Sequence, residues 1–299
     1  MKKHIYPYLL IALFGLISCE ETIDIDVDEG EPQLTVDAWL TDQPGLQTIR
    51  LTMSQAYFAN EFNDPALGAE VAVVSLQDSS IYNFTDPDAD GSYTWGAEEG
   101  ESFVEVGGQY GLGIAYQDKE FFSLSRANPV PDIDSLVFVY EEEELGQPEG
   151  YYGELFATDL PGVGDCYWIK AYKNGEFLNK PSEINIAFDA GFSQGTATDG
   201  ITFIAPVRSA VNPVPNPDDD PAPGYEVGDS LYVEIHAIPQ EAFYYMIELQ
   251  GQLQNGGLFA TPTANVPTNI FNADENDDTQ ALGFFAVSSV SSEGNRLEP

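Results

Sequence analysis

Hydrophobic and polar residues alternate over much of the chain, with the period of two that is typical of β-strands with one buried face. Leu34, Val36, Ala38 and Leu40 would share one face of the first such strand. Further strands are predicted at residues 49–53, 71–73, 110–116, 136–140, 167–172, 184–188 and 231–235. Gly, Asn, Asp and Pro separate these short runs, so the pattern predicts an all-β protein built from β-sandwiches.

One segment has helical spacing instead. It starts after Pro239 and ends at Asn255-Gly256-Gly257. Its apolar positions are Phe243, Tyr244, Met246, Ile247 and Leu253. This spacing predicts a helix over about residues 240–255 that packs its apolar stripe on the second sheet.

The best domain boundary is Asn128-Pro129-Val130-Pro131, because proline donates no hydrogen bond to a β-ladder. We therefore expect two β-sandwich-like domains, residues 33–128 and residues 129–299, with the helix packed in the second. The proline- and aspartate-rich stretch from Val211 to Gly224 predicts an exposed loop.

The N-terminus has the pattern of a lipoprotein signal. Two lysines precede an apolar run from Ile5 to Ile17, and Leu16-Ile17-Ser18-Cys19 fits a bacterial lipobox. The run is too short to span a bilayer. We expect residues 1–18 to be removed, Cys19 to carry lipid and the acidic residues 19–32 to form a tether. An ordinary signal peptide that happens to contain Cys19 is the alternative.

The chain is strongly acidic. It has 10 basic and 50 acidic residues, a formal net charge of −40. Nucleic-acid binders need clustered Lys and Arg, so the composition argues against a nucleic-acid partner. The same charge repels anionic lipid headgroups, so the attached lipid would have to provide the contact with the membrane.

After cleavage, Cys166 would be the one cysteine besides Cys19, and His236 would be the one histidine. Cys166 lies in a strand-like run, and we interpret it as a buried apolar residue. His236 also lies on a predicted strand, and the chain has no Gly-x-Ser-x-Gly motif to supply a nucleophile. One histidine and one buried cysteine cannot supply a zinc site of the usual type, so we interpret His236 as structural.

Asp86, Asp88 and Asp90, followed by Gly91, match the start of a calcium-binding loop. The twelfth position, where a bidentate acid is needed, is Ala97. Two interpretations stay open here: a calcium site, or an acidic hairpin turn between residues 81–84 and 92–95 that binds no cofactor.

Carbohydrate chemistry has two candidate features. Acid pairs for glycoside hydrolysis are common by chance in such an acidic chain. Four aromatic residues could stack on sugar rings or belong to the core and rim of a sandwich: Tyr151, Tyr152, Trp168 and Tyr172.

Several short motifs occur in a characteristic order after the lipobox. They are Leu34-Thr35-Val36-Asp37, Gly68-Ala69-Glu70-Val71, Gly91-Ser92-Tyr93, Tyr110-Gly111-Leu112, Pro131-x-Ile133-Asp134-Ser135, Asn265-Val266-Pro267-Thr268-Asn269-Ile270 and Gly283-Phe284-Phe285-Ala286-Val287-Ser288. In this order they resemble a Bacteroidetes-type lipoprotein family that is a domain of unknown function. The resemblance implies a lipid-anchored outer-membrane protein that is an accessory to TonB-dependent receptors. Glu20-Glu21 is similar to the surface-export signals of this bacterial group, so we expect a surface-exposed position.

The pattern from Gly68 to Tyr93 also resembles transthyretin-like or carboxypeptidase-regulatory-like modules, so the first sandwich is expected to be immunoglobulin/transthyretin-like. The chain departs from the family pattern at Val36-Asp37-Ala38, where a Val-Glu-Gly-like triplet is expected. Within Asn265–Ile270, Asn265, Thr268 and Asn269 are candidates for contacts with a ligand or partner. The other interpretation of this segment is a rigid loop that braces the helix against the Gly283-Phe284-Phe285 strand.

These observations predict a non-catalytic surface lipoprotein that binds a ligand or a TonB-dependent receptor during nutrient uptake. Two alternatives stay open: a secreted hydrolase that uses carboxylates, and a structural or adhesion module. A pair of acids in a deep cleft would favour the hydrolase, and a broad apolar patch above the tether would favour the receptor partner.

Overall fold

The computed structural model describes residues 30–56, 59, 61–96, 102–144, 147–195, 197–215, 224–255 and 264–299. The strands are β1 (Leu34–Thr41), β2 (Leu46–Met53), β3 (Glu70–Ser75), β4 (Ile81–Phe84), β5 (Ser92–Gly96), β6 (Gln109–Tyr116), β7 (Lys119–Arg126), β8 (Ile133–Glu141), β9 (Gly150–Ala157), β10 (Cys166–Lys173), β11 (Glu176–Phe177), β12 (Asn185–Phe188), β13 (Ser230–Ala237), β14 (Phe271–Asn272) and β15 (Leu282–Arg296). The helical elements are the 3-10 turn η1 (Pro181–Glu183), α2 (Ala205–Ser209) and α3 (Gln240–Leu253). The expectation of an all-β fold with one substantial helix is confirmed.

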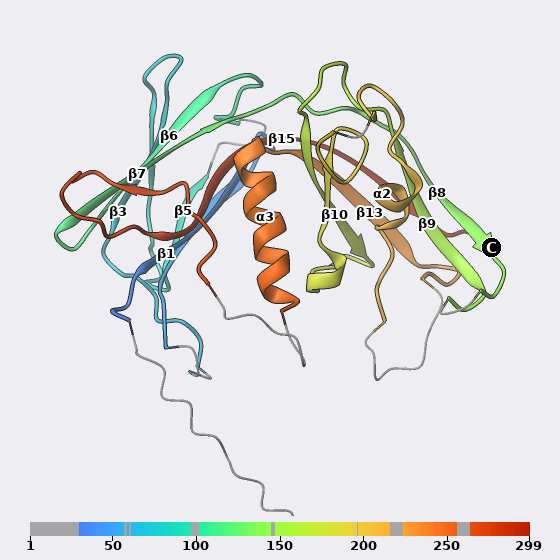
Figure 1. Cartoon of the computed structure of the whole chain (residues 1–299), viewed down its shortest axis with the longest axis horizontal. Coiled ribbons are helices and arrows are strands. Elements are labelled where there is room, and N and C mark those ends of the chain that lie inside the picture. The colour runs from blue at the N-terminus through green and yellow to red at the C-terminus, as the bar shows by residue number, and fades with distance from the viewer. Residues whose placement is uncertain are drawn as a thin grey trace, which may run out of the picture.

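The last strand, β15, connects the two halves of the molecule. Its first part, Leu282–Ser288, pairs in parallel with β1, and its second part, Ser289–Arg296, pairs antiparallel with β13. The result is one eight-stranded sheet in the order β11-β10-β13-β15-β1-β2-β5, with β12 also paired to β10. Figure 1 shows β15 as an arch across the top of the molecule, with one lobe of strands on either side.

The first lobe is a sandwich around a core that the alternation of residues predicts. Leu34, Val36, Ala38 and Leu40 of β1 are all buried and face the five-stranded sheet β14-β7-β6-β3-β4. Phe285 and Val287 of β15 enter the same core, although they lie near the other end of the sequence. The strands predicted over residues 49–53, 71–73 and 110–116 are confirmed as β2, β3 and β6.

The second lobe packs β10 and β13 against the hairpin β8–β9 and helix α2. Leu231, Val233 and Ile235 of β13 are fully buried in this second core together with Tyr167 and Leu155. The division of the chain at residues 128 and 129 stays a prediction. What the structure adds is that β15 contributes side chains or ladder pairs to both lobes, so the final strand is shared.

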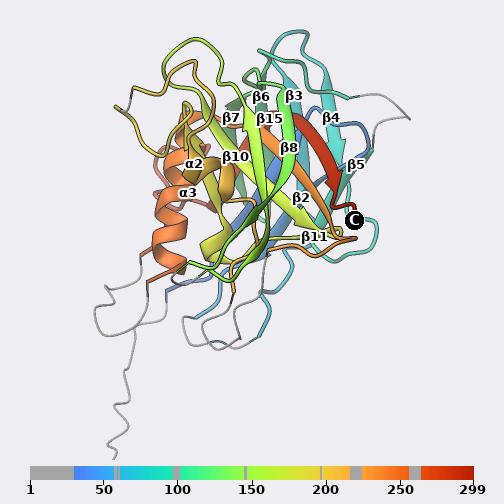
Figure 2. The ribbon, with the colours of Figure 1, turned by 90° about the vertical axis from the view of Figure 1, so that its right-hand side faces the viewer.

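Helix α3 covers a third apolar cluster, on the face of the eight-stranded sheet that points away from both sandwich cores. It contacts β10, β12 and β15. In Figure 1 it lies under the arch of β15, and in the side view of Figure 2 it lies outside the strand layers. The predicted helix is confirmed, but its predicted stripe is partly wrong. Phe243 and Met246 are buried, whereas Tyr244, Ile247 and Leu253 are exposed.

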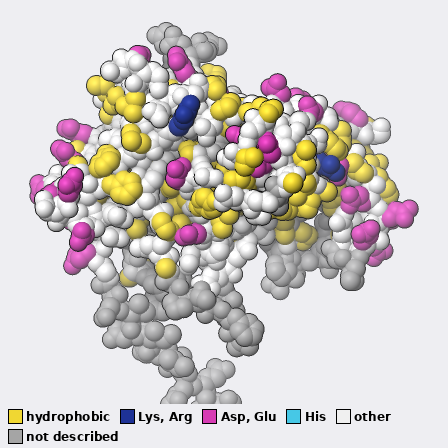
Figure 3. Space-filling view, turned by 45° about the horizontal axis from the view of Figure 1, so that its top comes forward, with side chains coloured by type: hydrophobic (Ala, Val, Ile, Leu, Met, Phe, Trp, Pro, Cys, Tyr) yellow, Lys and Arg dark blue, Asp and Glu magenta, His cyan; other side chains and the backbone are white. Residues whose placement is uncertain are grey.

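The lipobox and most of the acidic tether lie outside the described residues. Among the residues that the structure describes, no helix has the length and apolar character needed to cross a bilayer. Figure 3 shows acidic side chains spread over the viewed face, with hydrophobic groups between them.

Candidate functional site

A recess of about 330 Å³ opens beside α3, where the two lobes meet under the eight-stranded sheet. We call it the aromatic recess. Its lining is Thr35, Val36, Asp37, Trp39, Trp168, Phe177, Leu178, Asn179, Glu183, Ile184, Tyr245, Met246, Leu249, Gly283 and Phe284. Strands from both lobes and the helix therefore build one apolar hollow, and such hollows between packed units are common ligand sites.

The strand period places the aromatic residues. Because Val36, Ala38 and Leu40 face the first core, Asp37 and Trp39 point to the opposite side of β1. In β15, Phe285 enters the first core, and Phe284 therefore points the other way, toward α3. On α3, Tyr245 packs against the same cluster.

The rings contact one another in the arrangements that aromatic pairs favour. Trp39 meets Trp168 edge-on at 5.1 Å between ring centroids and stacks on Phe284 at 5.7 Å. Tyr245 lies 4.7 Å from Phe284. Each such pair contributes about 0.5–1.5 kcal/mol beyond the area it buries, so the aromatic wall is held in place before any ligand arrives.

Trp39, Trp168 and Tyr245 are only partly buried. Their rings therefore still present surface to the recess while their other faces are packed. This combination of fixed position and accessible ring surface is suited to binding a flat or apolar group.

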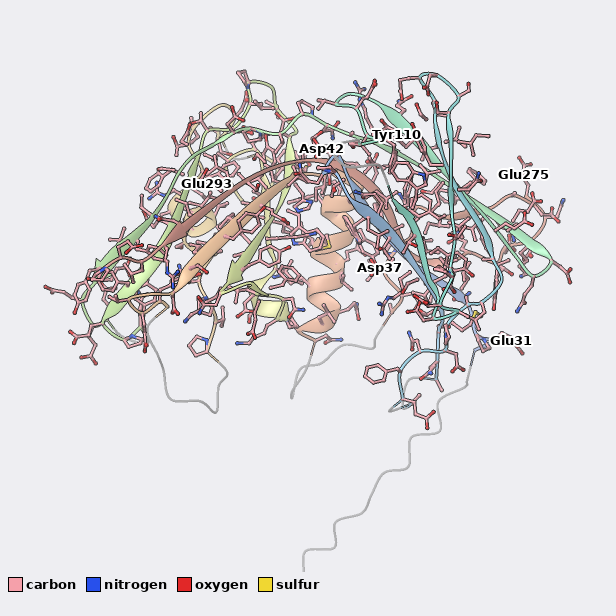
Figure 4. All side chains as sticks on the ribbon, turned by 180° about the vertical axis from the view of Figure 1, so that it is seen from behind. Glu31, Asp37, Asp42, Tyr110, Glu275 and Glu293 are labelled. Carbon is pink, nitrogen blue, oxygen red and sulfur yellow. The ribbon has the colours of Figure 1, made fainter. Side chains whose placement is uncertain are left out.

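Asp37 supplies a negative charge in the aromatic recess. Water reaches its side chain, but the surrounding protein desolvates the carboxyl group and raises its pKa, an effect that Arg50 and Lys170 oppose. Figure 4 shows Asp37 on β1 beside α3.

A positive charge lies next to the recess. The Lys170 ammonium is 4.0 Å from the centroid of the Trp168 ring. Burial lowers the pKa of Lys170, and Glu234 and Asp37 oppose that shift. The apolar hollow thus has the Asp37 carboxylate in its lining and the Lys170 ammonium beside it.

Glu183 also lines the recess, but its carboxylate is committed to the fold. One oxygen accepts a hydrogen bond from the Val214 N–H at 2.9 Å and lies 3.4 Å from the Lys180 ammonium. The other accepts a hydrogen bond from the Lys180 N–H at 2.9 Å. Glu183 therefore fixes the η1 turn and leaves Asp37 as the carboxylate in the recess that makes no hydrogen bond with a described residue.

His236 lies on the same sheet face, outside the recess lining. Its Nε2 is 3.0 Å from Glu234 and its Nδ1 is 3.4 Å from the Ser288 hydroxyl. Burial lowers the pKa of His236 to about 4, so the ring is neutral near pH 7. Cys166 is buried beneath α3, and burial raises the pKa of its thiol to about 12. These environments agree with the structural interpretation of both residues.

The Asp86–Gly91 segment connects β4 in one sheet to β5 in the other, so it is not a simple hairpin within one sheet. Asp86 accepts hydrogen bonds from the Asp90 and Gly91 N–H groups, and Asp90 accepts one from Ser92. No three metal-ligating side chains converge there or elsewhere in the described part of the chain. Asp86 and Asp90 therefore support the turn directly, and calcium binding by Asp88 with them stays a prediction.

The loop before β14 braces β15. Asn269 donates to the Phe285 carbonyl at 2.8 Å and accepts from the Phe285 N–H at 3.0 Å. Thr268 accepts a hydrogen bond from the Ile270 N–H, and Asn265 is exposed. Asn269 and Thr268 are thus bonded to backbone, and a ligand contact by any of the three stays a prediction.

The sequence pattern singled out one residue of the aromatic recess as a candidate ligand contact, Trp168. Tyr151, Tyr152 and Tyr172 do not line it. Sequence reasoning missed Trp39 and Tyr245, although Trp39 carries a signal: a large aromatic residue on the polar side of an alternating strand indicates a second packed face. Cys19 lies outside the described residues.

A second hollow, of about 430 Å³, lies between β9 and the segment after α2. It has Glu141, Glu154 and Glu183 in its lining. Its acidic lining makes it a poorer site for an uncharged or apolar ligand than the aromatic recess.

None of the curated proteins compared with this chain matches it. The motifs distributed from the first strand to β15 predicted a family of unknown function, and a family model confirms that prediction. The model described as "Domain of unknown function (DUF4249)" matches residues 20–294, so the chain belongs to this family.

Proposed function

We propose that the protein is a non-catalytic binding protein that holds a small organic ligand in the aromatic recess. The proposal includes a lipid anchor at Cys19 and a place on the surface of the outer membrane as an accessory to nutrient uptake. The anchor is supported by the lipobox, and the setting by the family resemblance of the motifs.

The observation that carries the proposal is the position of the aromatic recess. Residues of β1, β10, α3 and β15 meet there, and they leave partly buried rings around a hollow of about 330 Å³. A purely structural module would be expected to close such a junction with packed side chains, because interiors are filled to high density. An open, ring-lined junction instead favours a ligand.

The hydrolase alternative needs two free acids. Asp37 is free and has a raised pKa, as a general acid needs, but Glu183 is bonded through both oxygens. Glycoside hydrolysis requires a second carboxylate that can act as base or nucleophile. This arrangement favours binding over catalysis.

Replacing Tyr245 with alanine should weaken ligand binding about tenfold or more, because truncating a central aromatic contact removes packing that a ligand cannot recover. Binding is measured by titration calorimetry and tryptophan fluorescence against dipeptides, disaccharides and flat aromatic acids. Two of the three tryptophans, Trp39 and Trp168, line the recess, so a bound ligand should change the emission.

Tyr244→Ala is the matched control, since Tyr244 is adjacent on α3 and exposed, and it donates to Gln194 outside the recess. It should leave affinity unchanged. Equal losses in the two variants, or a wild-type protein that binds nothing in the panel, would contradict the proposal. Turnover of a panel compound that Asp37→Asn abolishes would support the hydrolase instead.

The lipid anchor has its own test. Cys19→Ala should abolish acylation and move the protein from the membrane fraction to the soluble fraction, because the acyl chains provide the affinity for the bilayer. Mass spectrometry of the N-terminus and fractionation measure both effects. Cys166→Ala is the control, as Cys166 is buried beneath α3 and should leave fractionation unchanged. An unmodified Cys19 in the wild-type protein would end this part of the proposal.

A further inference from the structure

Two opposite charges lie at the aromatic recess: Asp37 is part of its lining, and the Lys170 ammonium packs on the Trp168 ring beside it. No direct ion pair or hydrogen bond joins the Asp37 carboxylate or the Lys170 ammonium to another described residue, although the Arg50 charge acts on Asp37 and the Glu234 charge acts on Lys170 from farther away. Desolvation disfavours the charged form of each group. The opposite charges nearby offset this only in part: Arg50 and then Lys170 act on Asp37, and Glu234 and then Asp37 act on Lys170. Groups held in this way gain most from a ligand that brings the complementary charges.

The apolar lining of the aromatic recess argues against a sugar as its ligand. Alongside the rings, the recess is lined by Leu178, Ile184, Met246 and Leu249. Hydroxyl groups on both edges of a sugar would need hydrogen-bond partners, and burying them against aliphatic carbon leaves them unsatisfied. An apolar side chain fits this surface without that penalty.

We infer that the aromatic recess receives a short peptide with an apolar side chain, its ammonium group on Asp37 and its carboxylate on Lys170. This inference rests on the proposed function and specifies its substrate class. The apolar side chain lies against Trp39, Trp168 and Tyr245, and each charged end of the peptide meets a group of opposite charge that makes no direct ion pair with a described residue. A peptide of this kind carries no net charge, so the strongly acidic surface does not repel it.

The test uses the dipeptide leucyl-phenylalanine, its N-acetyl form and its C-terminal amide with the whole mature protein. The free dipeptide should bind, and each blocked form should bind about tenfold more weakly or worse, the loss expected for one charged hydrogen bond. This comparison uses the wild-type protein, so it does not depend on a variant that folds.

Two variants then test which residue binds each end of the dipeptide. Asp37→Asn should weaken binding of the free dipeptide but should not weaken the N-acetyl form further, and Lys170→Gln should do the same for the amide. Glu293→Gln on β15 removes one charge at an exposed position outside the recess and is the matched control for Asp37→Asn.

The outcomes separate the two claims. Equal binding of free and blocked dipeptides overturns the inference. Binding of a neutral disaccharide that Tyr245→Ala weakens, with no binding of the dipeptide, also overturns it but leaves the proposed function standing. No binding of any compound overturns both. If blocking one end and substituting its assigned residue weaken binding additively, the assignment of that end is overturned.

Discussion

Replacing Gly283 with alanine should prevent the chain from reaching its native fold, or lower its melting temperature by roughly 10 °C or more. Gly283 has a φ of +89°, in the left-handed region, where a Cβ is strained. A Cβ there would also lie 1.9 Å from the Val36 carbonyl oxygen. Backbone cannot move aside as a flexible side chain can, so β1 and β15 would have to separate.

Gly251→Ala is the matched control for this prediction. Gly251 lies in the last turn of α3, and a Cβ there meets nothing within 4 Å. Alanine should stabilise the protein by about 0.4–1 kcal/mol, because it lowers the conformational entropy of the unfolded chain. Thermal unfolding followed by circular dichroism measures both variants. A Gly283→Ala protein with wild-type stability would show that β15 does not approach β1 as described.

Asn269→Ala should lower the free energy of unfolding by about 2–4 kcal/mol, because it leaves two backbone groups of Phe285 without partners. The Phe285 N–H and carbonyl both bond to the Asn269 amide, and the Phe285 side chain is fully buried. Within the described part of the chain, no strand pairs with that edge of β15 over this stretch, since β13 pairs only from Ser289 onward. Asn269 thus replaces a strand at this position.

Two further variants test this interpretation by denaturant unfolding. Asn269→Asp keeps the acceptor and loses the donor. Its free energy of unfolding should therefore lie between those of Asn269→Ala and the wild type near neutral pH. Asn265→Ala should change stability by less than about 0.5 kcal/mol, as expected for an exposed residue. If Asn265→Ala costs as much as Asn269→Ala, the edge contact is not the reason for the loss.

The strands were largely predictable from local sequence. Leu34, Val36, Ala38 and Leu40 alternate with polar positions because a strand with one buried face needs that period, and β1 matches the prediction. The helix was predictable in place, since its spacing begins after Pro239. Its buried face was less predictable, because Tyr244 and Ile247 fit an apolar stripe as well as Tyr245 and Leu249 do.

The aromatic recess was not predictable in the same way. Asp37 drew notice only in the family comparison, as the end of one matching motif and the middle of the triplet that departs from the pattern, and Trp39 and Tyr245 drew none. Asp37 and Trp39 lie on one strand, but Tyr245 follows Trp39 by 206 positions (245 − 39) in the sequence. The three residues come together because β15 pairs with both β1 and β13 and packs against α3. Periodicity shows which way a side chain points from its own strand, but it does not show which distant surface it meets.

The sequence by itself determined the all-β class, most strands, the position of the helix, the acidic surface and the expectation of a lipid anchor. These follow from interactions between residues close in the chain or from composition. Only the tertiary structure decided that β15 is shared between the lobes, that Asn269 closes its free edge, and that Asp37 and Lys170 lie at one apolar hollow. Each of these depends on non-local pairing, whose partners the local pattern leaves unspecified.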